Sequence, residues 1–228
     1  KALTRRELIN FSMQNSVIAI SVSHTDLVIL SDMTFRSNQT RVVGLYDPSL
    51  ETRLEIRNSL FESNQCPVRA PFDDLLVTGS TFRENTCAAP YCSSSPCYGG
   101  AIYGDVDGNA IVEDSIFIGN SSGERGGAVA NVTQIIGSYF ESNFAGQYGG
   151  AIFRRDFRNR LMTIEGNRFV ANRCGGGGYC SILVGPAHIS NNVMINDENR
   201  SDADIQAFSE GSYGTLVSNN LLVDTIFS

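Results

Sequence analysis

The sequence predicts an all-β protein, a parallel β-helix (solenoid) of about eight coils with three short strands in each coil. Three observations lead to this fold class. One short motif returns along the 228-residue chain, strand-like runs separate its copies, and a second motif contains paired glycines. Self-similarity at a spacing of about 20–50 residues is typical of solenoids and other repeat folds. We therefore expect residues 1–228 to form one elongated domain.

The first motif is an aliphatic residue, a Phe five positions later and an Asn three positions after the Phe. Ile164, Phe169 and Asn172 form one copy, and successive Phe positions lie 21 to 35 residues apart. The complete copies contain Phe35 and Asn38, Phe61 and Asn64, Phe82 and Asn85, Phe117 and Asn120, Phe140 and Asn143, and Phe169 and Asn172. Two degraded copies contain Met194 with Asp197 and Leu222 with Thr225.

The residues between the copies favour strands and turns. Runs such as 17–23 and 27–30 are rich in β-branched and aliphatic residues and are punctuated by Gly, Asn, Asp and Ser. Amphipathic helices would need apolar residues at i, i+3, i+4 and i+7, which the sequence lacks. Strands of about five residues, three to a coil, account for the repeat, and coils then stack about 4.8 Å apart. We expect each Phe to stack inside. Each motif Asn should lie at a turn, where Asn tolerates the left-handed conformation and its amide bonds backbone groups of neighbouring coils.

The second motif, Gly-Gly-Ala followed by Ile or Val, is expected to begin an inward strand. It occupies residues 99–102, 126–129 and 149–152, with a weaker relative at 177–182. Paired glycines permit a tight turn with positive φ and a close approach of two backbones. A phosphate-binding loop is not indicated, because no Lys-Ser/Thr pair and no helix follow the glycines.

Together, Phe-x-x-Asn and Gly-Gly-Ala-Ile resemble the passenger repeats of the chlamydial polymorphic membrane proteins. The resemblance covers roughly residues 27–185 and is weaker beyond them. It implies a right-handed parallel β-helix and an adhesin or surface-structural module instead of a catalyst. The Cys-rich insertion of this chain departs from the family's pattern.

Charge and hydropathy narrow the range of partners. The chain has 17 Lys and Arg against 24 Asp and Glu, a net charge of −7. Nucleic acid is not expected as a partner, because phosphate binding favours clustered Lys and Arg. No apolar run approaches 18 residues, so we expect no direct membrane insertion. Because both ends look cut within the repeat, we expect a segment of a larger polypeptide or assembly. The expected partners are further domains, other subunits or glycans.

Six cysteines indicate the compartment. Cys66 and Cys87 each lie two residues after a motif Asn, so they are expected to stack within disulfide range. The predicted pairs are Cys66–Cys87, Cys92–Cys97 and Cys174–Cys180. Paired cysteines favour an extracellular or cell-surface location. A zinc site is not indicated, since the spacings are loose and neither His is adjacent. No cofactor is expected.

The sequence contains Asn-x-Ser/Thr sequons, which are candidate N-glycosylation sites. They occur at Asn38, Asn120, Asn131 and Asn199. The first two are motif asparagines, which we expect to be engaged in turns. Asn131 and Asn199 are therefore the better acceptors.

Polysaccharide lyases and hydrolases also use parallel β-helices, so a carbohydrate-active or carbohydrate-binding protein is the alternative. Hydrolysis needs two carboxyls about 5–10 Å apart. We interpret the acidic candidates as turn residues and the histidines as ladder or surface residues, and we do not expect an enzyme. The candidates are Asp73, Asp74, Asp105, Asp107, Asp114, Asp156, Asp202, Asp204, His24 and His188.

Two insertions are expected to project from the rod, and one further turn has a calcium alternative. The insertions are a Cys-rich loop at 86–98 and an Arg-rich loop at 153–161. The Arg-rich loop offers guanidinium groups to an acidic partner or a neighbouring copy, through Arg154, Arg155, Arg158 and Arg160. Asp105 and Asp107 resemble part of a calcium loop, but a plain turn is favoured because no helices flank them.

Overall fold

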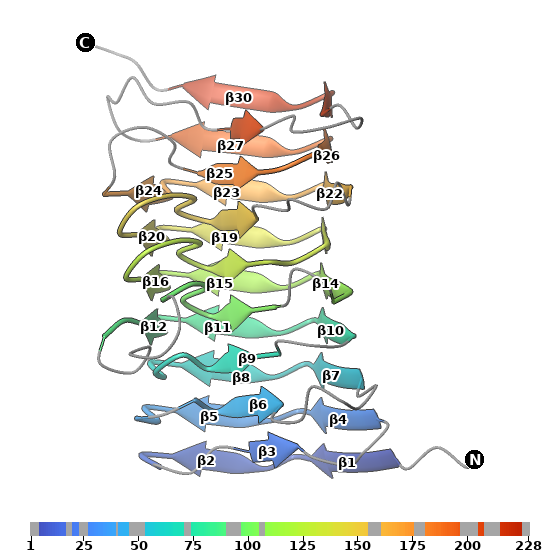
Figure 1. The fold of residues 1–228 in the computed structure, drawn as a ribbon. Coiled ribbons are helices and arrows are strands. Elements are labelled where there is room, and N and C mark those ends of the chain that lie inside the picture. Colours follow the sequence, from blue (N-terminus) through green and yellow to red (C-terminus); the bar gives the residue numbers. More distant parts are fainter. Residues whose placement is uncertain are drawn as a thin grey trace.

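The computed structural model describes residues 5–16, 20–22, 27–39, 41–45, 53–70, 74–89, 97–104, 108–154, 161–175, 181–196, 205–207 and 215–224. In these ranges the chain forms a parallel β-solenoid, with the strands of each coil lying on those of the coil before (Figure 1). The fold class predicted from the repeat is therefore confirmed. No helix in these ranges is long and apolar enough to cross a membrane.

Two sheets, A and B, run the length of the solenoid with nine parallel strands each. Sheet A contains β1 (Arg5–Ile9), β4 (Leu27–Ser31), β7 (Arg53–Arg57), β10 (Leu75–Thr78), β14 (Ala110–Glu113), β18 (Gln134–Ile136), β22 (Met162–Glu165), β26 (Ala187–Ser190) and β29 (Leu216–Ser218). Sheet B contains β2 (Ser12–Gln14), β5 (Thr34–Arg36), β8 (Leu60–Glu62), β11 (Thr81–Arg83), β15 (Ile116–Ile118), β19 (Tyr139–Glu141), β23 (Arg168–Val170), β27 (Val193–Asn196) and β30 (Leu221–Asp224).

Two further sheets complete the coils. Sheet C contains β3 (Ile20–Val22), β6 (Val43–Leu45), β9 (Val68–Arg69), β13 (Ile102–Tyr103), β17 (Val129–Ala130), β21 (Ile152–Arg154), β25 (Ile182–Val184) and β28 (Ile205–Ala207). The short sheet D contains β12 (Thr86–Cys87), β16 (Ser121–Ser122), β20 (Phe144–Ala145) and β24 (Arg173–Cys174). Four consecutive coils thus have a fourth short strand in addition to the three that were predicted.

The ninth coil, absent from the predicted count of eight, lies at the N-terminal end. Its strands β1 and β2 pair with β4 and β5, which places Leu8 beside Leu30 and Met13 beside Phe35. Met13 therefore occupies the Phe position. The motif did not reveal this coil because Met replaces the Phe and Ser16 replaces the Asn.

The six motif Phe rings form one buried stack, as predicted. Successive ring centroids lie 4.7 to 5.0 Å apart. Offset-stacked rings add stabilisation beyond the apolar area that they bury. Met13 and Met194 extend this column at its two ends.

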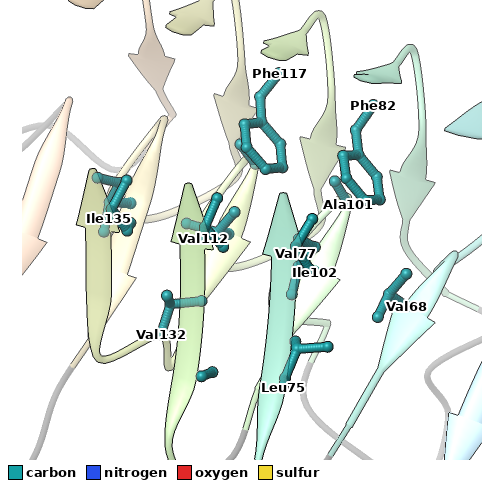
Figure 2. Close-up of a cluster of buried hydrophobic side chains, with 14 of the residues drawn as sticks. Val68, Leu75, Val77, Phe82, Ala101, Ile102, Val112, Phe117, Val132 and Ile135 are labelled. Carbon is teal, nitrogen blue, oxygen red and sulfur yellow. The ribbon is translucent and has the colours of Figure 1, made fainter. Parts of the chain in front are cut away.

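A parallel column of aliphatic residues on sheet A faces the Phe stack. Its members pair rung by rung, as Val77 does with Val112 and Val112 with Ile135. Figure 2 shows these three side chains in line inside the solenoid, with Phe82 and Phe117 beside them. The column is Leu30, Ile56, Val77, Val112, Ile135, Ile164 and Ile189, and all seven are fully buried.

The motif asparagines form a buried ladder of side-chain amides. Asn85 is representative: its Nδ2 donates to Asn120 Oδ1 (2.9 Å) and to the Phe61 carbonyl oxygen (2.9 Å). Its Oδ1 accepts from the backbone N–H (3.0 Å) and Nδ2 (3.1 Å) of Asn64. Each amide thus joins three coils. The left-handed conformation falls on the residue before each Asn, as at Glu84 with a φ of +54°, and not on the Asn itself.

A second polar ladder lies at the turn between sheets A and B. The Oγ of Ser80 accepts a hydrogen bond from the backbone N–H of Ser59 (3.1 Å). In turn, the Oγ of Ser115 accepts one from the backbone N–H of Ser80 (3.2 Å). Three asparagines continue the ladder toward the C-terminal end. Its members are Ser59, Ser80, Ser115, Ser138, Asn167, Asn192 and Asn220.

The paired glycines behave as the sequence predicts. Gly99 has a φ of +67°, and a Cβ there would lie 2.0 Å from the carbonyl oxygen of Ile102. A Cβ on Gly100 would lie 2.1 Å from the carbonyl oxygen of Gly127 in the next coil. The first glycine permits the turn, and the second permits the close stacking of two turns.

Candidate functional site

The first predicted disulfide is present in the structure. Cys66 and Cys87 are bonded, with their Cα atoms 4.5 Å apart. Because both follow a ladder Asn by two residues, the coil stacking brings them together. Cys97 and Cys174 are also disulfide-bonded. Their expected partners, Cys92 and Cys180, lie outside the described residues, so those two pairings stay predictions.

Two predicted surface positions are buried instead. Asn131 has 4% of its surface exposed, so the folded chain does not offer it as a glycan acceptor. Arg154 has 1% exposed and is the last residue of β21. Strand β21 extends into the predicted Arg-rich loop and pairs Arg154 with the buried Val184, so Arg154 does not project into solvent. Asn199, Arg155, Arg158 and Arg160 lie outside the described residues.

Some of the acidic candidates and one histidine lie within the described residues, and the others lie outside them. Asp114 is exposed and has a φ of +45° at the turn after β14, as expected for a turn residue. His188 is exposed on β26. No group of three metal-ligating side chains occurs in the described ranges. Asp105 and Asp107 fall outside them, as do Asp73, Asp156, Asp202, Asp204 and His24.

The strongest candidate for a contact site is on the outer face of sheet C. Inward and outward residues alternate along its strands, so Ile102 and Val129 are buried while Tyr103 faces outward. The residue before each Gly-Gly pair stacks on its counterparts, and Arg125 pairs with both Tyr98 and Tyr148. The arginine–tyrosine cluster comprises Arg69, Tyr98, Tyr103, Arg125, Tyr148 and Phe153.

Arg125 lies at the centre of this cluster. Its guanidinium carbon Cζ lies 5.3 Å from the ring centroid of Tyr98, 5.6 Å from that of Tyr148 and 5.2 Å from that of Phe153. The small Ala130 lies between Tyr103 and Phe153 on sheet C and is fully buried. It packs with the aromatic side chains of the cluster.

Arg69 marks one edge of the cluster. Its Cζ lies 4.7 Å from the ring centroid of Tyr103, which meets Tyr98 edge-on at 6.1 Å. Burial lowers the pKa of Arg69, and the nearby positive charge of Arg41 lowers it further. Both effects disfavour the charged form, which an anion beside Arg69 would stabilise.

The arginines of the cluster differ from Arg36 and Arg83 on sheet B. On sheet B, Glu62 accepts from Arg36 (2.9 Å) and from Arg83. In the part of the chain that the structure describes, no ion pair joins Arg69 or Arg125 to a carboxylate. The Nε of Arg125 is buried and has no hydrogen-bond partner among the described residues. The cluster therefore combines cationic donors with aromatic faces.

The cluster was missed by the sequence interpretation, although a signal existed. Tyr98, Arg125 and Tyr148 all immediately precede a Gly-Gly pair. That shared position predicts stacking once the coils are aligned. The contacts with Tyr103 and Phe153 depend in addition on which way each strand faces.

Comparison with models of protein families, with curated proteins and with solved structures found no match to this chain.

Proposed function

We propose that the chain is an extracellular structural or adhesive module, a rigid scaffold that displays contact surfaces within a surface protein or assembly. The observation that carries this proposal is the continuity of the buried ladders. The Phe stack runs from Phe35 to Phe169, and the amide ladder from Asn38 to Asn172 accompanies it. Bending the rod at any of these rungs would separate stacked rings and break buried hydrogen bonds.

Two further observations support a location outside the cell. The Cys66–Cys87 disulfide joins neighbouring coils, and disulfides persist in oxidising compartments. The Phe-x-x-Asn and Gly-Gly-Ala-Ile motifs resemble the repeats of surface-displayed polymorphic membrane proteins. A scaffold at a cell surface would use both the stiffness and the covalent cross-link.

Polysaccharide binding is the second candidate function, and the arginine–tyrosine cluster favours it. The cluster combines aromatic rings with guanidinium groups, a combination that is suited to a sugar chain. A degrading activity would in addition require two carboxyls about 5–10 Å apart on that surface.

Surface labelling tests the proposed function. An antibody against the folded chain is applied to intact and to permeabilised cells of the source. Labelling of intact cells, and a native mass far above that of one chain under non-reducing conditions, would support the proposal. Labelling only after permeabilisation would contradict it.

A further inference from the structure

We propose that the arginine–tyrosine cluster binds an acidic polysaccharide that runs along the solenoid axis. A uronate carboxylate would pair with Arg125, and the faces of flanking sugar rings would pack on Tyr98 and Tyr148. This inference rests on the proposed function, because it names the ligand class of the scaffold's contact face.

The positive charge of the cluster favours an anionic ligand. Arg69 and Arg125 are half-buried and lack a carboxylate partner within the described residues. Among the residues that the structure describes, the buried Nε–H of Arg125 has no acceptor. A guanidinium presents donors in a planar fork that matches a carboxylate. Because the whole chain has a net charge of −7, attraction at this face must come from these local contacts.

The aromatic rings distinguish a sugar chain from other polyanions. Tyr98 and Tyr148 lie two rungs apart with Arg125 between them. At about 4.8 Å per rung, the two rings are spaced by about 9.6 Å along the axis, close to the length of a disaccharide unit. Tyrosine offers an apolar ring face and a polar tip, as a sugar ring requires. A nucleic acid would instead favour a dense cluster of Lys and Arg.

Binding is measured with fluorescently labelled oligogalacturonate, in which every sugar carries a carboxylate. The methyl-esterified oligomer removes the charge and keeps the rings, and poly-L-glutamate keeps the charge and removes the rings. We expect the free acid to bind best and its affinity to fall as salt is added. Preference for poly-L-glutamate would point to an acidic peptide and overturn the proposal, as would no binding of the free acid.

Matched variants locate the site. Arg125→Ala removes a charged donor, and the expected weakening is about tenfold or more. Tyr148→Ala removes one ring and is expected to weaken binding as well. The controls Arg83→Ala and Tyr139→Ala make the same changes on sheet B and are expected to bind as the parent chain does. Equal losses on both sheets, or no loss on sheet C, would overturn the assigned site.

A conservative variant covers the case in which Arg125→Ala does not fold. Arg125→Lys keeps the positive charge but loses the planar fork, so weaker binding than the parent supports the carboxylate contact. Unchanged binding by Arg125→Lys would overturn it. Hydrogen exchange adds a readout, with ligand-dependent protection expected at 97–104 and 125–130. Failure of these tests leaves surface labelling unaffected, so the two proposals fail separately.

Discussion

Replacing Asn120 with Ala tests whether the buried amide ladder holds the coils together. Asn120 is fully buried, and its Oδ1 accepts from the backbone N–H (3.1 Å) and Nδ2 (2.9 Å) of Asn85. Its Nδ2 donates to Asn143 Oδ1 (3.0 Å) and to the Phe82 carbonyl oxygen (2.9 Å). The substitution removes all four hydrogen bonds and fills none of the space.

The expected cost follows from the donors left without an acceptor. The backbone N–H of Asn85 and one N–H of its amide lose their partner in a buried site. At about 1–3 kcal/mol for each orphaned donor, Asn120→Ala is expected to lower the free energy of unfolding by about 2–6 kcal/mol. That is a large share of the roughly 5–15 kcal/mol that typical domains possess.

Urea unfolding followed by far-ultraviolet circular dichroism measures this cost. The midpoint is expected to fall while the slope stays constant, because the same surface is exposed. Asn109→Ala is the control, since Asn109 is exposed and its side chain accepts a hydrogen bond from Thr133, while its backbone bond to Leu75 is kept. If Asn120→Ala shifts the midpoint no more than Asn109→Ala does, the ladder does not stabilise the stack and the reasoning is refuted.

Three further predictions address other parts of the solenoid. Replacing Cys66 and Cys87 together with Ala opens a 21-residue cross-link and is expected to cost about 3 kcal/mol in urea unfolding. Gly100→Ala places a Cβ 2.1 Å from a carbonyl oxygen of the next coil, so we expect little folded protein by circular dichroism. The hydrogen bond from Arg83 lowers the pKa of Glu62, so this pair stabilises the fold above the ordinary carboxyl pKa, and the stabilisation is lost as pH falls through the lowered pKa. Arg83→Ala is expected to raise the pKa of Glu62 in an NMR titration.

Each of these predictions has an opposing outcome. Equal stability of the double cysteine variant and the parent chain under non-reducing conditions would contradict a stabilising cross-link. Gly166→Ala is the control for Gly100→Ala, because its nearest atom would lie 3.9 Å away and only its φ of +66° is strained. Equal yields of the two variants would argue against the close approach. An unchanged Glu62 pKa in Arg83→Ala would mean that another group holds it down.

The repeat made much of the fold predictable. Fixed spacing of Phe and Asn implies axial stacking, because equivalent positions in a parallel coil lie above one another. The Phe stack, the aliphatic column, the Cys66–Cys87 pair and the role of the paired glycines all follow from that rule. The second polar ladder was not predicted, although Ser or Asn lies two residues before nearly every motif Phe. The first coil was not predicted either, because Met13 and Ser16 break the motif.

Other features depend on three-dimensional geometry that the one-dimensional pattern does not encode. Asn131 and Arg154 look like loop residues, but each comes at the end of a sheet C strand, and both are buried there. The positive φ falls beside each ladder Asn because the amide must point inward to bond three coils.

The sequence by itself determined the stacking, because a repeat of fixed spacing brings like residues onto like positions. The tertiary structure alone decided which side chains from different positions meet. Arg125 meets Phe153 of the next coil because Phe153 lies on the outer side of β21, beside the small Ala130. Such contacts depend on the facing of each strand and on the size of its neighbours, and neither is set by the repeat.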